Sequence, residues 1–473
     1  MKKIRHVGTL APALFIIAFV ALWISNGQGI IKNDPENNIA IPAELLMPLQ
    51  VRASYNHERI FFQYRWPADR PSYLHDVFKF ESGSWKRYGN AVPGSEPHGL
   101  HEDRVAMMVD DGSVPDFARY GGYINIGTGL VGMSDEASSD EVKKHAYLGQ
   151  QRGQSEVTKF LPQTRNSSDW ADTADADRIK QLRAAGYFLD LWHWRSARGN
   201  PLNISDDQLV HDVRDGDSGR SAWFTNWDAE NNQPLVMFNP DVAGHAALNW
   251  DIIQSGQLDP SSIYYLHEST MQPFDPDYEW QEGDVLPRRA LRTPEGSRSD
   301  IAANAFWADG YWNVSLSRLM DTQAPLDDKI FVDGGEYSIA FSVHRDATGG
   351  RWHYISMPIS LGLGRDAQLS AYKEAGANPT WAQDWHDVTL FYPGQVTWSH
   401  LTSKAHAGSN KIAKKVPALA FHNEEQLALY GIESEFRKPI KQQWYLTLFS
   451  GLFLFAAIGL FLYRSITPAK GAN

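Results

Sequence analysis

Two histidines, His344 and His353, lie on either side of a glycine-rich stretch and could do chemistry together. The residues before His344 and after His353 read as β-strands, and the stretch 346–350 between them ends in two adjacent glycines, which is typical of a hairpin turn. Such a hairpin would hold two imidazole groups at the base of its turn. The pair is either a structural corner or half of a ligand site.

A noncovalent haem is one ligand that such side chains could bind, because haem iron takes axial ligands from neutral imidazole or thioether groups. Met133 closes a glycine-rich segment at 120–133, where the backbone can approach a flat ring, and His353 or His344 could serve opposite it. Met133 could equally be a core packing residue. The ring would also need flat apolar walls and cations for its propionates, and the candidates are Trp192, Trp194, Trp352, Arg195 and Arg351.

Other kinds of site have less support in the sequence. The chain has no cysteine, which excludes disulfides, thiolate metal sites, iron–sulfur clusters and covalent haem attachment through CxxCH. HExxH, EF-hand and GxSxG motifs are absent. His98 and His101 could form a metal pair, although they lie in a loop flanked by proline and glycine. We interpret the aspartate pairs at 206–207 and 327–328 as solvated turn residues.

The composition limits the class of protein. The chain of 473 residues is 42% hydrophobic and can bury a large core. Its formal net charge of -12 argues against a nucleic-acid partner, and no basic stripe interleaved with aromatic residues is present. The 17 tryptophans and 19 tyrosines suit a β-sandwich, a stacking surface and a cofactor pocket alike.

Short alternating runs of apolar and polar residues predict a mainly β protein. The clearest runs lie at 49–66, 101–110, 188–195, 312–317 and 337–343. We expect an antiparallel β-sandwich with long loop insertions at about 134–186 and 196–280.

The N-terminus has the pattern of an export signal. Lys2, Lys3 and Arg5 precede an apolar stretch at 7–24 that carries no charge. Bulky residues occupy the place of a cleavage site, so we interpret residues 1–26 as an uncleaved signal anchor, with a cleaved signal peptide as the alternative.

A second apolar segment predicts a C-terminal transmembrane helix. Residues 444–463 form an apolar run with aromatic residues at both ends, so we expect the helix at 443–464. A cytoplasmic tail at 465–473 would follow it. The basic N-terminus then places residues 27–442 on the far side of the membrane, in the periplasm of a bacterium whose inner membrane holds both helices.

Four motifs in sequence order carry a family resemblance. They are EDRVA at 102–106, LDLWHWR at 189–195, GSRSD at 296–300 followed by WADGYW at 307–312, and FSVHRDATGGRWHYIS at 341–356. Together they resemble the haem-binding (gamma) subunits of ethylbenzene dehydrogenase and of related periplasmic molybdenum enzymes of the dimethyl sulfoxide reductase type.

The resemblance implies an antiparallel β-sandwich that encloses one haem b. Such a subunit relays electrons between the iron–sulfur chain of a partner and a soluble acceptor. The family ligands are a methionine after the EDRVA strand, which Met133 matches, and a lysine on the closing hairpin, whose position His353 occupies. The resemblance therefore implies Met133 and His353 as iron ligands, with His344 as the alternative to His353.

The sequence thus predicts a membrane-anchored, b-type electron-transfer protein without substrate chemistry of its own. Its partner would be a redox protein, a complex of the molybdenum-enzyme type or a soluble cytochrome. A second hypothesis is a haem-free β-sandwich that binds a small ligand through tryptophans or assembles a membrane complex. A third is an enzyme with a histidine metal site.

Overall fold

The computed structural model describes residues 46–89, 100–133, 135–345, 353–381, 383–392, 396–406, 408–420 and 437–466, together with Pro12, Phe15, Ile16, Phe19 and Val20. The chain divides into two compact units. One is Ala40–Ala428, which contains the β structure, and the other combines Met1–Ile39 with Leu429–Asn473.

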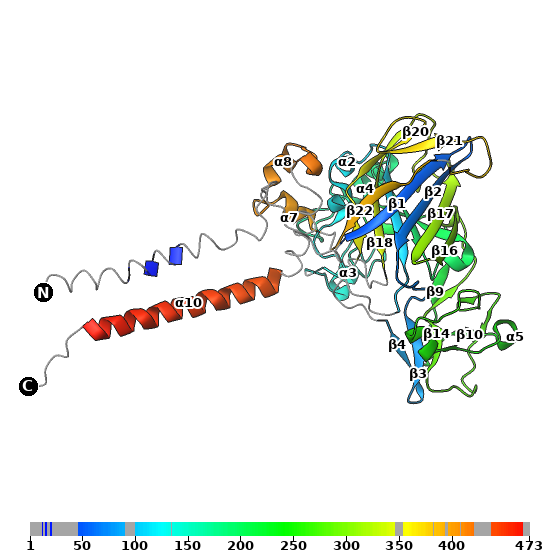
Figure 1. Ribbon diagram of the computed structural model, residues 1–473, viewed down its shortest axis with the longest axis horizontal. Coiled ribbons are helices and arrows are strands. Elements are labelled where there is room, and N and C mark those ends of the chain that lie inside the picture. The colour runs from blue at the N-terminus through cyan, green and yellow to red at the C-terminus, as the bar shows by residue number, and fades with distance from the viewer. Residues whose placement is uncertain are drawn as a thin grey trace, which may run out of the picture. The chain divides into compact units, whose positions relative to one another are not determined.

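Ten antiparallel strands of the larger unit close into a barrel. In order around the barrel they are β18 (Glu336–His344), β19 (Tyr354–Ile355), β22 (His386–Phe391), β1 (Leu46–Tyr55), β2 (Arg59–Pro67), β17 (Tyr311–Leu319), β16 (Ile301–Ala308), β7 (Ile204–Val210), β6 (Leu189–Arg195) and β5 (Arg104–Asp110), which pairs with β18 again. Strands β1, β2, β17 and β16 lie side by side in Figure 1.

The mainly antiparallel β fold is confirmed, but its strands form one closed barrel and not two separate sheets. The closure depends on two short seams. On one side, β16 pairs with β7 through Ile301↔Ser205 and Ala302↔Ile204. On the other, the short strand β19 joins β18 to β22 through the single pair Ile355↔Phe391. These seams give hydrogen-bond partners to strands that would otherwise be edges.

Aromatic side chains fill the middle of the barrel. Trp312 on β17 is fully buried there, as the alternation of this strand predicts. Its ring centroid lies 5.1 Å from that of Trp194 on β6 and 6.2 Å from that of Trp66 on β2. On β6, Trp192 also faces inward, against Phe62 of β2 at 5.5 Å. These contacts join opposite walls of the barrel into one core.

Three further strands extend the barrel sheet. They are β20 (Ile359–Leu363), β21 (Leu369–Lys373) and β8 (Arg214–Gly216). Strand β20 pairs with β18, and β21 links β20 to β1 in parallel.

Three small sheets make a separate group of strands in the same unit. They contain β3 (Val77–Glu81), β4 (Ser84–Tyr88), β9 (Trp223–Thr225), β10 (Val236–Phe238), β11 (Leu248–Asn249), β12 (Leu266–His267), β13 (Met271–Pro273), β14 (Asp284–Pro287) and β15 (Arg289–Leu291). Strands β3, β4, β10 and β14 lie together in Figure 1, at the opposite end of this unit from β20 and β21.

The helices of this unit are short. They are α2 (Phe117–Tyr120), α3 (Ser139–Lys144), α4 (Ala176–Ala184), α5 (Pro240–Ala243), α6 (Trp250–Gln254), α7 (Trp398–Thr402) and α8 (Ser409–Ala413), with 3-10 turns η2 (Gly121–Asn125), η3 (Asn200–Leu202), η4 (Ser297–Ser299) and η5 (Ala418–Ala420).

Both expected insertions contain ordered structure. The segment 134–186 carries α3 and α4 and packs around its own apolar cluster, which includes Met133 and Phe160. The segment 196–280 supplies barrel strand β7 as well as short strands of the small sheets. The aspartate pairs at 206–207 and 327–328 are buried, so their interpretation as solvated turn residues is wrong.

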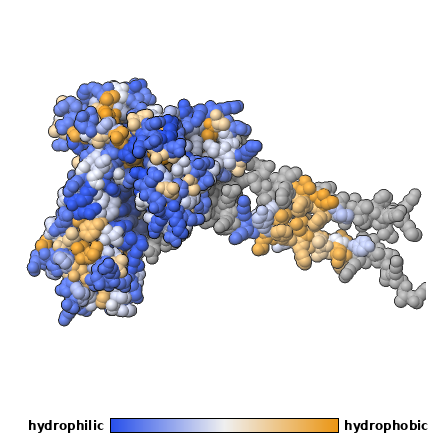
Figure 2. All heavy atoms as spheres, turned by 180° about the vertical axis from the view of Figure 1, so that it is seen from behind, coloured by the Kyte–Doolittle hydropathy of each residue, from blue (hydrophilic) through white to orange (hydrophobic). Residues whose placement is uncertain are grey.

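The second unit contains α10 (Arg437–Ile466). Within it, Trp444–Tyr463 is long and apolar enough to cross a membrane, with a mean hydropathy of 2.1. Figure 2 shows the exposed surface of this helix as largely hydrophobic. The expected N-terminal anchor at 1–26 lies, apart from five residues, outside the part of the chain that the structure describes.

Candidate functional site

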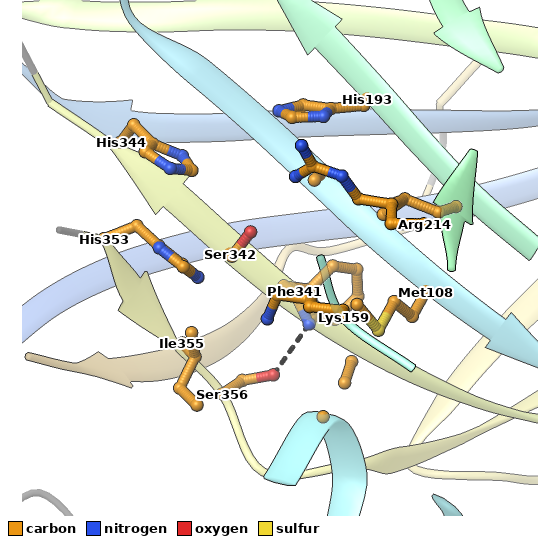
Figure 3. A pocket seen from close by; sticks show the side chains of 14 residues that line it. Met108, Lys159, His193, Arg214, Phe341, Ser342, His344, His353, Ile355 and Ser356 are labelled. Atoms are coloured by element: carbon orange, nitrogen blue, oxygen red, sulfur yellow. Dashed lines mark hydrogen bonds between the residues drawn. The ribbon is translucent and has the colours of Figure 1, made fainter. Parts of the chain in front are cut away.

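The candidate site is a pocket on the outer face of the barrel wall formed by β5, β6 and β18 (Figure 3). Its cavity volume is about 50 Å³, and the pocket opens to solvent. Because strand side chains alternate, residues next to the inward-facing core residues of these strands point outward into it. Its apolar walls include Leu191, Ala340 and Ile355.

Three histidines form a stack along one side of this pocket. The ring of His344 on β18 lies between the rings of His193 on β6 and His353, which precedes β19. The ring centroids of His344 and His353 are 4.4 Å apart and those of His193 and His344 are 6.2 Å apart, both in stacked orientation. The antiparallel pairing of β18 with β19, through Ser342↔Ile355, brings the rings of His344 and His353 together.

His344 has the properties of a metal ligand. Its side chain is buried, and neither ring nitrogen has a hydrogen-bond partner among the described residues. Burial lowers the pKa of His344 well below its ordinary value, and the neighbouring charges of His353 and Arg104 lower it further. The imidazole is therefore neutral, which is the form that binds iron or zinc.

His193 differs from His344 because one of its nitrogens is already occupied. A guanidinium nitrogen of Arg195 lies 3.0 Å from its Nδ1. Oε1 of Gln208 lies 3.3 Å from the same Nδ1, so this nitrogen has both a donor and an acceptor beside it. Burial lowers the pKa of His193 well below its ordinary value, so the ring is neutral. The Nε2 of His193 has no partner among the described residues.

Met108 on β5 lines the pocket across from the histidines in Figure 3. Its sulfur accepts a hydrogen bond from Asn125 at 3.4 Å. A Cβ added to Gly122 would lie 4.0 Å from this sulfur, so the backbone of η2 approaches the thioether closely. Met108 is therefore a thioether held in place, with a second sulfur lone pair that this hydrogen bond does not use.

Two cationic side chains complete the pocket. Lys159 and Arg214 line it, and neither comes from the barrel strands that carry the histidines. Burial, followed by the charge of Arg214, lowers the pKa of Lys159 to about 7. Burial likewise lowers the pKa of Arg214, with nearby carboxylates opposing this shift. Two desolvated cations beside an apolar cavity would stabilise an anionic group on a bound ligand.

The structure brings some of the sequence-predicted residues together and separates others. His344 and His353 lie in the pocket. Met133 lies outside the pocket lining, in the apolar cluster of the 134–186 segment. Trp192 and Trp194 face the barrel interior, on the opposite side of β6 from His193.

Only one of the two predicted arginines, Arg195, lies in the described part of the chain. Arg195 is bound to Asp206 at 2.5 Å and does not line the cavity. Arg351 and Trp352 lie outside the described residues.

Sequence reasoning missed four pocket residues, which are Met108, Lys159, His193 and Arg214. Two of them had a usable signal. In the strands at 101–110 and 188–195, Met108 and His193 alternate with inward-facing apolar residues, so both must face the other side of the wall. Lys159 and Arg214 come from segments without regular alternation, where no such signal exists.

A second histidine cluster lies near β3. His75, Asp76 and His101 could place their ligand atoms within 4.8 Å of one another. However, Asp76 already binds Arg87 and Arg288, and Nε2 of His101 lies 2.6 Å from the carbonyl of Gly89. A metal ion would have to replace these cations, so the arrangement is a structural ion-pair network. His98, the expected partner of His101, lies outside the described residues.

Comparison with known proteins identifies the family. The family described as ethylbenzene dehydrogenase matches residues 23–356, and the chain belongs to it. The match covers the barrel strands from β1 to β19 and therefore the pocket residues on β5, β6 and β18. No curated protein sequence matches the chain.

Proposed function

We propose that the chain is a membrane-anchored electron-transfer protein that binds one haem b noncovalently in the pocket on β5, β6 and β18. The observation that carries the proposal is the buried imidazole of His344, whose two nitrogens have no partner among the described residues and which stacks on His353 beside an apolar cavity. Membership of the ethylbenzene dehydrogenase family, which is linked to haem subunits, supports the same ligand.

The residues of the pocket fit the chemical requirements of a haem. The iron would be held by the thioether of Met108 and by one imidazole of the His344–His353 pair. This replaces the pair Met133 and His353 that sequence reasoning indicated, because Met133 is not part of the pocket lining. When bound, the haem would supply a one-electron couple.

The other side chains would set the properties of that couple. Leu191, Ala340 and Ile355 would exclude water, which favours the less charged state of a buried iron centre. Lys159 and Arg214 would neutralise the propionates, in place of the expected Arg195 and Arg351.

The protein would act as the haem subunit of an ethylbenzene dehydrogenase-type complex or pass electrons to a soluble cytochrome. The apolar helix Trp444–Tyr463 would anchor it in a bacterial inner membrane, with the barrel in the periplasm. Protease treatment of intact spheroplasts tests this orientation. Digestion of the barrel without membrane rupture is expected, and its protection would contradict a periplasmic location.

Visible spectroscopy of the full-length protein in detergent tests the cofactor. We expect a sharp α-band after dithionite reduction and a b-type pyridine haemochrome. The double substitution of His344 and His353 by Ala should remove the low-spin bands, while the exposed control His57→Ala should keep them. A colourless protein that takes up no added haemin would refute the proposal and favour a haem-free ligand-binding or assembly module.

A further inference from the structure

A group of five aspartates lies at one end of the barrel interior, away from the haem pocket. Two of them project inward from neighbouring strands, Asp190 from β6 and Asp207 from β7. The other three lie in connections between strands, and they are Asp217 after β8, Asp300 before β16 and Asp328 between β17 and β18. Oxygens of Asp190, Asp207 and Asp328 lie within 4.8 Å of one another.

One buried arginine accounts for part of this negative charge. Arg318 on β17 is fully buried and donates to Asp190 at 2.7 Å, to Asp207 at 2.9 Å and to Asp328 at 2.8 Å. Hydroxyl groups also donate to the second oxygen of Asp328, from Ser297 at 3.0 Å and Thr322 at 2.5 Å.

Several oxygens of the group remain without a partner. Both carboxylate oxygens of Asp217 are buried and unpartnered among the described residues, and the residue is only 3% exposed. One oxygen each of Asp190 and Asp300 is in the same state. Asp217 lies close to Asp207, whose carbonyl accepts from the Asp217 N–H at 3.2 Å. An unpaired buried carboxylate is costly unless a cation or a proton joins it.

The charges of the group do not balance. Five carboxylates face a single guanidinium, and the ion pairs of Asp190, Asp207 and Asp328 within the described residues all come from Arg318. The nearby ammonium of Lys329 is turned to Asp111 at 2.8 Å and to the carbonyl of Gly186 at 2.7 Å. The carboxylates of the group repel one another, and Asp300 shows the effect. Burial first, and then the negative charge of Asp328, raise the pKa of Asp300 to about 7.

We propose that this aspartate group is a structural Ca²⁺ site, built where oxygens of Asp190, Asp207 and Asp328 lie within 4.8 Å of one another and completed by the unpartnered oxygens of Asp217 and Asp300. The donor set consists of hard carboxylate oxygens, which Ca²⁺ prefers, and contains no nitrogen or sulfur that would favour zinc or copper. Mg²⁺ is disfavoured because it retains several waters and demands octahedral geometry, which a buried group of protein oxygens does not offer.

The ion would connect three loops to the barrel wall. Asp217 and Asp300 belong to connections on either side of the β16–β7 seam, which itself has only two residue pairs. A cation shared by these carboxylates would reinforce this short seam of the barrel. The site uses the inward face of β6, whereas the haem pocket uses its outward face, so the two proposals can fail separately.

The test uses the full-length protein purified in detergent without added metal. Metal content is measured by mass spectrometry, and Tm is measured after EGTA treatment and during titration with CaCl₂ or MgCl₂. We expect about one tightly held calcium per chain and a rise in Tm of roughly 5 °C or more on readdition of Ca²⁺. Mg²⁺ should give a clearly smaller rise.

Two substitutions, one in the aspartate group and one beside it, test which carboxylates bind the ion. Asp217→Asn should raise the Ca²⁺ concentration for half-maximal stabilisation at least about tenfold. Asp206→Asn is the matched control, since Asp206 precedes Asp207 on β7 but binds Arg195 and Arg298 instead. It should lower Tm equally with Ca²⁺ and with EGTA.

Two results with the wild-type protein would contradict the proposal, whether or not the variants fold. A wild-type protein that retains no calcium and whose Tm is unchanged by Ca²⁺ up to millimolar concentrations would overturn it, and the carboxylates would then be balanced by protons. An equal or larger response to Mg²⁺ would overturn the assignment to Ca²⁺.

Discussion

His344 and His353 stack their imidazole rings with centroids 4.4 Å apart, at the base of a hairpin whose turn lies between them in the sequence. Burial, and then the charge interaction with His353, lower the pKa of His344 well below its ordinary value. His344 therefore presents a neutral imidazole to the pocket at neutral pH. This makes His344 suited to metal ligation and unsuited to proton transfer near neutrality.

Met108→Leu tests the second proposed iron ligand. Leucine nearly conserves the volume but removes the sulfur, and thioether ligation stabilises ferrous haem. We expect the fold to be retained, the reduced spectrum to change and the midpoint potential to fall by roughly 0.1 V, within the roughly 0.8 V range that axial ligands span. Redox titration of the purified protein provides the measurement.

The adjacent residue provides the control for this experiment. Met107 faces the core, where its sulfur lies 3.3 Å from the hydroxyl of Tyr64. Met107→Leu should cost less than about 1.5 kcal/mol of stability and leave spectrum and potential unchanged. An unaltered spectrum in Met108→Leu would exclude Met108 as an iron ligand and would favour Met133 as the methionine ligand.

Lys159→Met and Arg214→Met test the binding of the propionates. Each substitution removes a desolvated cation while keeping an apolar stem at the pocket. A hydrogen bond to a charged group contributes about 1.5–3 kcal/mol, so the affinity of the apoprotein for haemin should fall roughly 10- to 100-fold. Lys180→Met, on the exposed surface of α4, should leave haemin affinity unchanged. Unchanged titration curves for both pocket variants would place the propionates elsewhere.

Trp194→Phe distinguishes core packing from contact with a haem. The indole of Trp194 lies inside the barrel, 5.1 Å from Trp312 and 6.1 Å from Trp66. The substitution leaves a cavity and should lower the free energy of unfolding by about 1–3 kcal/mol. The haem spectrum should not change, in contrast to what the sequence-based assignment of Trp194 to the ring implies. A shifted spectrum with unaltered stability would support that assignment.

The strands were predictable because each is a local pattern. The alternation around Trp312 and the hairpin that carries His344 and His353 needed no long-range information. The closure of the barrel did not have a local signal, since Ile355↔Phe391 and Ile301↔Ser205 pair residues from distant segments. A single alternating run also leaves undetermined which of its faces meets the core.

The same limitation explains why the residues of the pocket differ from those that the sequence indicated. Trp192 and His193 are neighbours in one strand, and only the packing of opposite walls shows that the tryptophan is inside and the histidine outside. The aspartates at 206–207 can be buried because Arg195 and Arg318 neutralise their charges. These arginines lie on other strands, so the pairing is not apparent from the sequence around the aspartates. Charge compensation of this kind depends on tertiary contacts and cannot be read from adjacent residues.

Asp76→Asn tests the ion-pair network that holds β3 to β14 and its neighbours. Asp76 is buried and binds Arg87 and Arg288, the latter at 2.7 Å. Its backbone is left-handed, with φ of 54°, and asparagine tolerates this conformation. The substitution therefore removes the negative charge of the side chain without straining the backbone. Loss of the carboxylate leaves two partly buried cations without a partner and should cost roughly 2–3 kcal/mol at pH 7.

The pH dependence of this loss has a definite sign. Burial alone would raise the pKa of Asp76, but the hydrogen bond and charge of His101 and the charge of Arg87 together hold it below its ordinary value of 3.8. The folded state therefore binds fewer protons at Asp76 than the unfolded state, and the stabilisation is complete above pH 3.8 and is lost as the pH falls through the lowered pKa.

Urea unfolding at several pH values, followed by tryptophan fluorescence, measures this effect. The stability difference between wild type and Asp76→Asn should be fully present at about pH 5 and should shrink toward zero below about pH 3. Asp116→Asn breaks an exposed pair with Lys415 and should cost less than about 1 kcal/mol throughout. A difference for Asp76→Asn that stays constant down to pH 3 would show that Asp76 acts through its hydrogen-bond geometry and not through its charge.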